Sequence, residues 1–254
     1  MSKIGFIFST KDRVEFSKKT LEGIDVRGSN FDLIWVDGSD TKEGRLLPER
    51  TRFQYCNLAE VYYGMNAEYD KAPLSFGFKY LVQHNYDYCG FIENDIRFEK
   101  NWFIELMKLF NLGKGDGLEV GAATAKVWAS RVLRYEHNYV TIWNLGAAMV
   151  LFTAKAAKII YNNLYHGDKP RYIYARELQD FYLNKFGIDI RHNSWELLMG
   201  TQNRYLSRDW KYAMELSKHE LSSLGTIPSL AFDMEYNVEK RWRTHYVKTE
   251  RVNK

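Results

Sequence analysis

The chain has 254 residues, of which 45% are hydrophobic and 27% charged, and this is enough for one large α/β domain with a full core. No segment has the roughly 20 apolar residues that a membrane-spanning helix needs, and the apolar run at residues 4–8 is too short for a signal-peptide core. The two cysteines, Cys56 and Cys89, have no metal-ligand spacing, which favours a reducing, cytoplasmic location.

The net charge of +4 belongs to the C-terminal tail. Residues 237–254 contain six Lys and Arg side chains against two Glu, so the rest of the chain is neutral. Trp242 and Tyr246 lie among these cations, a pattern compatible with nucleic acid, with an anionic membrane surface or with a solvated end. We expect peripheral membrane contact through this tail and no binding of nucleic acid.

The first 41 residues predict two strands that both end in polar loops. Apolar residues alternate over 3–9, and helical spacing follows over 14–24. A second apolar run, 31–36, ends at the turn-forming residues 37–41. Because the turn-formers stand at the C-terminal ends of both runs, the pattern favours a parallel sheet with crossover helices.

The later segments continue this alternation. The expected elements are a basic loop at 45–52 around Pro48, a helix in two pieces over 58–85, a strand at 89–92, a helix at 102–112, a strand at 118–126, an apolar segment at 141–152, helices at 154–164 and 174–186, a short strand at 188–190 and a helix at 210–221. This order predicts an α/β protein with a doubly wound, mostly parallel sheet flanked by helices. The pattern weakens past residue 200, so we expect one domain over 1–205 and a C-terminal helical and basic extension over 206–254.

Two carboxylates end the strand at 89–92. Glu93 and Asp95 are two residues apart and therefore project from one face of an extended chain. Two hard oxygen ligands are half of a Mg²⁺ or Mn²⁺ site, which water and substrate phosphates complete. Alone, such a pair is more often a solvated strand end. Ligands of doubly wound sheets bind beyond the carboxyl ends of the strands, where Thr10 and Asp37 are expected to join these carboxylates.

Five stretches together resemble the nucleotide-sugar-dependent glycosyltransferases of the GT-A fold, closest in style to glycosyltransferase family 2. They are residues 7–13, 35–41, 91–95, 145–155 and 177–180. The resemblance covers about residues 1–200 and implies a GT-A-like sheet. It departs from the family pattern where Glu93 replaces the first Asp of the Asp-x-Asp metal motif, and where Leu178-Gln179-Asp180 stands for the x-Glu-Asp motif.

The resemblance also implies the roles of individual residues. Glu93 and Asp95 would hold Mn²⁺ or Mg²⁺, with His192 as the nearest candidate for a late metal-binding histidine. The residues implied in nucleotide-sugar binding are Thr10, Arg13, Asp37, Asp40, Asn94, Gly146 and Ala147. Several of these also have a plain structural alternative: Asp37 and Asp40 suit a turn, Arg13 suits a solvated surface charge, and Gly146 and Ala147 suit tight packing.

The acceptor side is expected at Trp143 and on the helix at 174–186. Trp143 would stack on an acceptor sugar, with an ordinary core tryptophan as the alternative. Asp180 is expected to be the general base, and Glu177, three residues earlier, orients it or replaces it. Both carboxylates also suit the N-terminal half of a helix without any catalytic role.

These expectations combine into a metal-dependent, inverting glycosyltransferase. It would move a sugar from a UDP- or GDP-type donor to a hydroxyl of a glycan, lipid-linked or protein-linked acceptor. One alternative is a sugar-phosphate nucleotidyltransferase, although the loop at residues 9–13 lacks the glycines typical of that class. The other is a non-enzymatic module that binds nucleic acid or a membrane through the basic tail.

Overall fold

The computed structural model describes residues 2–24, 31–51, 57–63, 71–145, 148–163, 171–190 and 208–234. Its elements, in chain order, are β1 (Ile4–Thr10), α1 (Val14–Ile24), β2 (Asp32–Asp37), α2 (Lys42–Thr51), β3 (Asn57–Tyr63), α3 (Lys71–Gln83), β4 (Tyr88–Glu93), β5 (Ile96–Phe98), α4 (Trp102–Gly115), β6 (Val120–Thr124), the short 3₁₀ helix η1 (Ala129–Arg131), β7 (Val132–Tyr135), β8 (Tyr139–Ile142), β9 (Met149–Thr153), α5 (Ala154–Asn163), α6 (Arg171–Phe186), α8 (Arg208–Lys218), β10 (Ser222–Thr226) and β11 (Ala231–Asp233).

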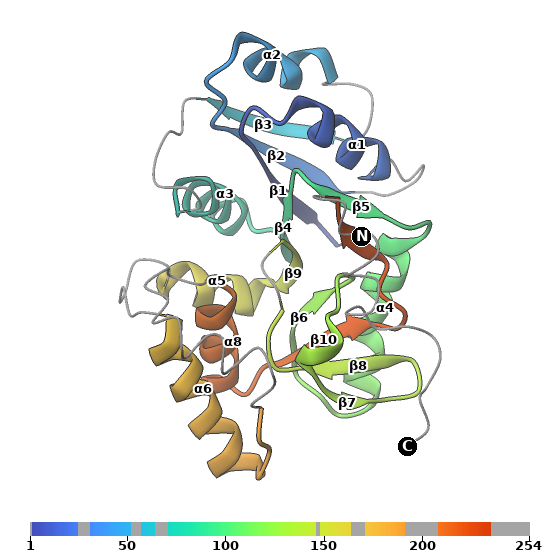
Figure 1. Ribbon diagram of the computed structural model, residues 1–254, viewed down its shortest axis with the longest axis vertical. Coiled ribbons are helices and arrows are strands. Elements are labelled where there is room, and N and C mark those ends of the chain that lie inside the picture. The colour runs from blue at the N-terminus through green and yellow to red at the C-terminus, as the bar shows by residue number, and fades with distance from the viewer. Residues whose placement is uncertain are drawn as a thin grey trace.

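Nine of these strands form one sheet in the order β3-β2-β1-β4-β9-β6-β10-β8-β7 (Figure 1). The strands β3, β2, β1 and β4 pair in parallel. β9 runs antiparallel to both β4 and β6, β10 is parallel to β6, and β8 is antiparallel to β10 and β7. Only β8 and β9 therefore oppose the common direction, which confirms the predicted mostly parallel sheet.

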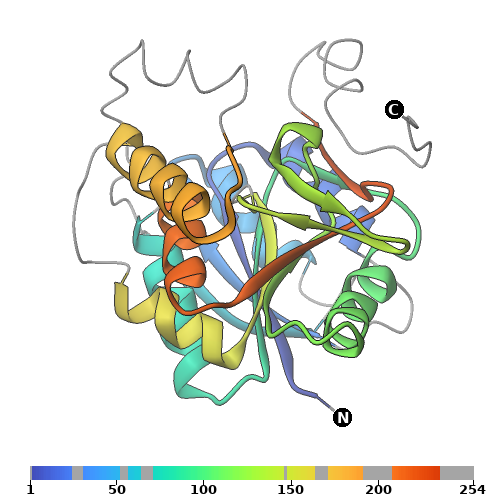
Figure 2. The ribbon, with the colours of Figure 1, turned by 90° about the horizontal axis from the view of Figure 1, so that it is seen from below.

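Helices cover both faces of the sheet, as the doubly wound prediction requires (Figure 2). Along β1, Phe6 and Phe8 belong to the core under α1 and α4, whereas Ile7 belongs to the core under α3, α5 and α8. This alternation follows from the two-residue period of a strand. Gly90 in β4 lets the ring of Phe6 approach, because a Cβ there would lie 2.2 Å from Phe6 Cδ1.

Two predicted segments have a different structure. Residues 45–51 of the basic loop expected at 45–52 belong instead to α2, because the Thr41 hydroxyl accepts a hydrogen bond from the Gly44 N–H (3.2 Å) at the start of this helix. The first part of the expected helix at 58–85 is strand β3, which pairs with β2, and only α3 is helical. Pairing with a neighbouring strand overrides local helix propensity here.

Two further segments also differ. The apolar segment 141–152 is divided between the end of β8 and the start of β9. The expected strand at 188–190 is irregular, because the Ile190 N–H donates to the side chain of Gln179 (2.9 Å) instead of to a sheet neighbour.

Part of the expected C-terminal extension is built into the sheet. Helix α8 packs against α5 and α6, and β10 lies between β6 and β8 as an inner strand. β11 forms a second, two-stranded sheet with β5. The structure differs from the expectation because β10 reads Ser-Ser-Leu-Gly-Thr, which has little strand signal of its own. Among the described residues, no helix is long and apolar enough to cross a membrane.

The thiol of Cys89 lies inside the sheet, on β4. The side chain is fully buried in the core under α3 and α5. Burial raises the pKa of this thiol to about 12.

Candidate functional site

The C-terminal ends of β1, β2 and β4 meet at one edge of the sheet. In the parallel register Thr10 lies beside Asp37, and Ser9 lies beside Glu93. The predicted convergence of Thr10, Asp37 and the Glu93/Asp95 pair at this edge is therefore confirmed. We call it the carboxyl edge.

Asp37 is the most buried acid of this edge, with no exposed surface. Its Oδ1 accepts hydrogen bonds from the hydroxyls of Thr10 (2.8 Å) and Ser39 (2.6 Å) and from the Ser39 N–H (3.2 Å). Trp35 Nε1 donates to Thr10 Oγ1 (2.8 Å) and fixes that hydroxyl. Within the described part of the chain, the buried Oδ2 of Asp37 has no hydrogen-bond partner. An N–H or O–H group of a ligand would satisfy this oxygen.

Asp12 ties the two loops of the edge together, a role that the sequence does not reveal. Its backbone has a φ of 56°, a left-handed conformation that Asp tolerates better than most residues. Its carboxylate accepts hydrogen bonds from the N–H groups of Asp40 (3.0 Å) and Thr41 (2.8 Å). The Thr41 N–H is the main cause that lowers the pKa of Asp12. The side chain of Asp40 is itself exposed, and its Oδ2 lies 3.8 Å from Lys11 Nζ.

Asp95 faces Arg13 across the same edge. Arg13 Nη1 lies 3.2 Å from Asp95 Oδ2, and the Asp95 side chain is 15% exposed. Glu93 is half-buried, and its N–H donates to the Ala148 carbonyl (2.9 Å). Asn94, between the two acids, donates from Nδ2 to Ser17 Oγ on α1 (3.1 Å) and so supports the turn. Arg13 and Asp95 are therefore brought together as predicted. Glu93 ends β4, but residues 94–95 form a turn instead of continuing the extended chain, so the geometry expected for the Glu93/Asp95 pair was wrong.

A buried lysine stands next to this turn and was missed in the sequence. The Met234 N–H donates to the Asp95 carbonyl (2.7 Å), which places β11 against the turn. Lys126, which is 7% exposed, bonds through Nζ to Asp233 Oδ1 at the end of β11. These two residues are 107 positions apart, so only the tertiary structure joins them.

The expected base and its alternative lie on α6. Asp180 is exposed and Glu177 is half-buried on α6, which makes its main contacts with α8. Leu178 and Gln179 between them are buried. The described contacts do not place Asp180 with the carboxyl edge.

Trp143 is a core residue in this structure. It is 4% exposed and packs in a cluster with Leu178, Tyr182 and Met214. Stacking on an acceptor sugar needs an exposed ring face, so the core alternative holds for Trp143. Gly146, Ala147 and His192, the other predicted site residues, lie outside the described residues.

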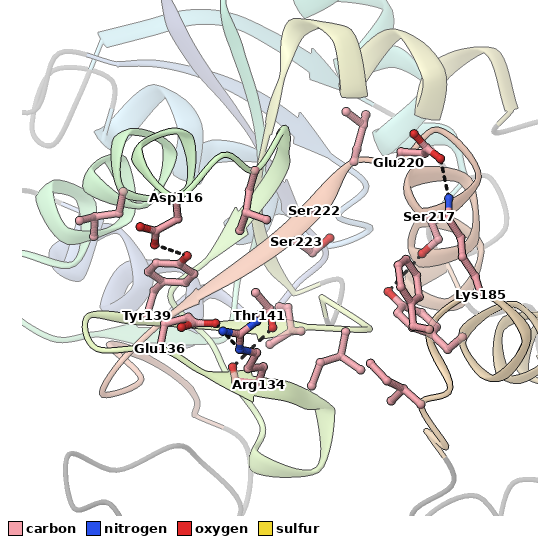
Figure 3. A pocket seen from close by; sticks show the side chains of 18 of the residues that line it. Asp116, Arg134, Glu136, Tyr139, Thr141, Lys185, Ser217, Glu220, Ser222 and Ser223 are labelled. Carbon is pink, nitrogen blue, oxygen red and sulfur yellow. Dashed lines mark hydrogen bonds and ion pairs between the residues drawn. The ribbon is translucent and has the colours of Figure 1, made fainter.

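The molecule also has a large cavity, whose lining side chains are shown in Figure 3. It has a volume of about 940 Å³ and is lined where β6 and β10 begin, by residues of the β7–β8 hairpin, α6 and α8. Asp37, Glu93 and Asp95 are not among its lining residues. We call it the distal cavity.

Comparison with known proteins identifies the fold. No family model matches the chain, and no curated protein matches it in sequence. The crystal structure of S. aureus TarS residues 1–349 superposes with a TM-score of 0.52 at 12% identity, covering 88% of this chain and 60% of that one. The fold is a GT-A-like glycosyltransferase fold. The apo structure of the bifunctional glycosyltransferase WbbM matches at a TM-score of 0.38 and 14% identity, over 64% of this chain and 33% of that one.

The carboxyl edge lies at the C-terminal ends of the parallel strands of this GT-A-like fold. This chain covers less than two thirds of each of these neighbours. The edge combines a buried acceptor atom on Asp37 with an acid–base pair at Arg13 and Asp95. At such an edge Asp37 can bind a polar, uncharged group of a ligand. Arg13 and Asp95 can bind an anionic group together with a cation.

Proposed function

We propose that this protein transfers a sugar from a nucleoside-diphosphate sugar to a hydroxyl acceptor, with the donor at the carboxyl edge. The observation that carries the proposal is the buried Oδ2 of Asp37, which lacks a donor at the place where β1 and β2 end. A nucleobase N–H or a ribose O–H supplies that donor. The diphosphate of the same ligand would then reach Arg13 and the turn at Asp95.

The residues of this turn fit a divalent cation. Glu93 and Asp95 supply two hard oxygen ligands, and the part of the chain that the structure describes holds no cluster of three or more His, Cys, Asp or Glu side chains around a metal position. Mg²⁺ and Mn²⁺ commonly bind one or two carboxylates together with substrate phosphates, so this donor set suits them. When bound, the cation would neutralise the charge that develops on the leaving diphosphate.

Protein cations act beside these carboxylates. Arg13 is partly exposed at the mouth of the edge and can pair with a phosphate oxygen. Lys126 is buried beside the same turn and pairs with Asp233, so it offsets a negative charge that would otherwise repel an anion arriving there. Removing either cation is expected to slow transfer more than it weakens substrate binding if the charge develops in the transition state.

The inverting outcome and the base rest on the family resemblance. We propose Asp180 as the base and Glu177 as its alternative, because α6 carries both acids. In a single displacement the base takes the proton of the acceptor hydroxyl while the sugar–phosphate bond breaks. A cytoplasmic location with peripheral membrane contact through residues 237–254 remains part of the proposal.

A thermal-denaturation screen tests the donor site. The protein is heated with UDP, GDP and their sugar derivatives, each with Mn²⁺ or with EDTA. Saturation with a ligand at about 100 times its Kd stabilises by about 2.7 kcal/mol, which corresponds to a rise in Tm of about 5 to 10 °C for a chain of this size. We expect that rise for at least one nucleotide, only with the metal present.

Asp95→Asn is the matched variant for this screen. It should abolish the metal-dependent part of the shift and lower the transfer rate at least about 100-fold. Glu119→Gln, at an exposed carboxylate just before β6 that pairs with Lys155, serves as the control and should leave both unchanged. A protein that gains no metal-dependent stability from any nucleotide would contradict the proposal.

A further inference from the structure

The distal cavity has the wall chemistry of a ligand site. Figure 3 shows β10 along its floor, with Asp116 and Tyr139 on one side and Lys185, Ser217 and Glu220 on the other. Its volume of about 940 Å³ lies at the upper end of the range for small-molecule pockets.

Charged side chains that line the cavity form ion pairs and hydrogen bonds with one another. Arg134 Nε pairs with Glu136 Oε1 (2.7 Å), and Lys185 Nζ pairs with Glu220 Oε1 (2.5 Å). Tyr139 donates its hydroxyl hydrogen to Asp116 Oδ2 (2.5 Å). The lining therefore carries three carboxylates against two Lys and Arg side chains. Such a surface repels phosphate and sulfate groups, whereas a polyol that both donates and accepts hydrogen bonds suits it.

The rim of the cavity exposes apolar rings. Phe186 lines the cavity and is 54% exposed, and its ring centroid lies 5.9 Å from that of Phe181. Ile188 also lines the cavity and is exposed, whereas the exposed Tyr135 and Leu183 lie on the neighbouring β7 and α6 without lining it. Clusters of this kind on a soluble protein mark binding surfaces. Ring faces beside hydroxyls and carboxylates suit the C–H faces and hydroxyls of a sugar ring.

The distance to the carboxyl edge restricts the ligand further. The cavity lies where β10 begins, and Asp95 follows the end of β4, three strand positions away in the sheet. Strand spacing and the length of β10 place the two sites on the order of 20 Å apart. A ligand that occupies both must therefore be an oligomer.

We propose that the distal cavity binds an uncharged oligosaccharide. It holds the segment of the glycan acceptor that is remote from the hydroxyl to be modified. The role of this segment as an acceptor rests on the function proposed above, whereas the binding itself does not. The cavity would then add affinity for long acceptors over short ones.

The experiment measures binding without nucleotide or metal. The full chain is applied to an array of neutral oligosaccharides together with phosphorylated and sulfated ones, and the ligands that bind are measured by titration calorimetry. We expect binding to neutral oligosaccharides of several units and none to the charged set. Phe186→Ala should weaken this binding at least about tenfold, and Phe186→Tyr, which keeps the ring, should retain it.

Phe76→Ala is the matched control, because Phe76 is a phenylalanine of comparable exposure (43%) on α3, outside the cavity. It should leave oligosaccharide binding unchanged. The proposal is overturned if no neutral oligosaccharide binds, if only the charged ones bind, or if the Phe76 and Phe186 variants lose binding equally. Loss of oligosaccharide binding in Phe186→Ala with an intact nucleotide shift separates this site from the donor site.

Discussion

Asp37 shows how one side chain can serve both the fold and a ligand. Three donors from Thr10 and Ser39 hold its Oδ1, so the carboxylate keeps one orientation without any ligand. Its second oxygen has no hydrogen-bond partner among the described residues and is, in our proposal, the acceptor for the donor nucleotide. Because the side chain is already fixed, a ligand that reaches Oδ2 spends little conformational entropy on ordering it.

Asp37→Asn is therefore expected to separate binding from stability. The amide can keep its oxygen toward Thr10 and Ser39, but it then presents an N–H₂ group where the ligand also has a donor. Affinity for the nucleotide that stabilises the wild type should fall about 10- to 100-fold, while the Tm without ligand stays the same or rises slightly.

Titration calorimetry and thermal denaturation of the two proteins measure these quantities. Glu119→Gln is again the control. Unchanged nucleotide affinity in the Asp37 variant would remove Asp37 from the donor site.

Residues of the site were predictable where they follow a strand end. Thr10, Asp37 and Asp95 were found because each stands at the end of an apolar run, and parallel strands end at one edge. Lys126 and Asp233 were not predicted, because two residues 107 positions apart leave no local pattern in the sequence. Trp143 was ambiguous for a related reason: a Trp after a strand has the same sequence signal in a core and in a cleft.

At the scale of elements, β4 depends on one close contact. Gly90 packs directly beneath Phe6, whose ring lies edge-on to Phe31 (5.1 Å between centroids) and Trp102 (6.0 Å). Phe6 is held by these rings and cannot move aside without disturbing them. The strand that ends in Glu93 is therefore positioned by the absence of a side chain at residue 90.

Gly90→Ala should destabilise the protein by about 1–3 kcal/mol, because the added methyl group overpacks this contact. Gly115→Ala is the matched control at the end of α4, where an added Cβ meets nothing within 4 Å. That substitution should be neutral or stabilise by up to about 1 kcal/mol, since Ala favours helix. Denaturant unfolding of both variants measures the difference, and equal stabilities would show that Phe6 adapts.

The helices and strands were predicted correctly where the sequence itself has a regular apolar spacing. They were missed where contacts with distant parts of the chain determine the local structure. The helix at residues 14–24 was predicted with its observed bounds, because its apolar spacing is regular. α2 and β3 were missed, since Asp12 and β2, respectively, support segments whose own propensities indicate other structures. The polar strand β10 was missed for the same reason.

At the scale of the molecule, buried tyrosine hydroxyls and a buried thiol make the free energy of unfolding fall with pH in the alkaline range. Burial, followed by the hydrogen bond to Asp32, raises the pKa of Tyr86, and burial raises the pKa of Cys89 and of Tyr139 to about 12. The unfolded chain releases these protons at about pH 8.5 for Cys and about pH 10 for Tyr. Between those values and the folded pKa, the native state holds more protons than the unfolded state, so stability falls as pH rises.

We therefore expect a constant contribution from these groups below about pH 8.5 and a declining free energy of unfolding above it, by at most about 1.4 kcal/mol per pH unit for each group. Tyr86→Phe should lose about 1 kcal/mol at neutral pH, because its hydrogen bond to Asp32 (2.6 Å) is absent. The same variant should decline less steeply above pH 10. Urea titrations at a series of pH values test this, and parallel pH profiles for the two proteins would contradict it.

The position of Cys89 gives the molecule a built-in reporter. In a Cys56→Ser background its sulfur is the sole thiol, and the flanking strands β1 and β9 enclose the strand that carries it. A maleimide dye can modify that sulfur only when the packing of α3 and α5 on this face of the sheet opens. The rate of labelling would therefore report how often the core around Cys89 opens. Binding of the sugar donor at Asp95 should lower this rate.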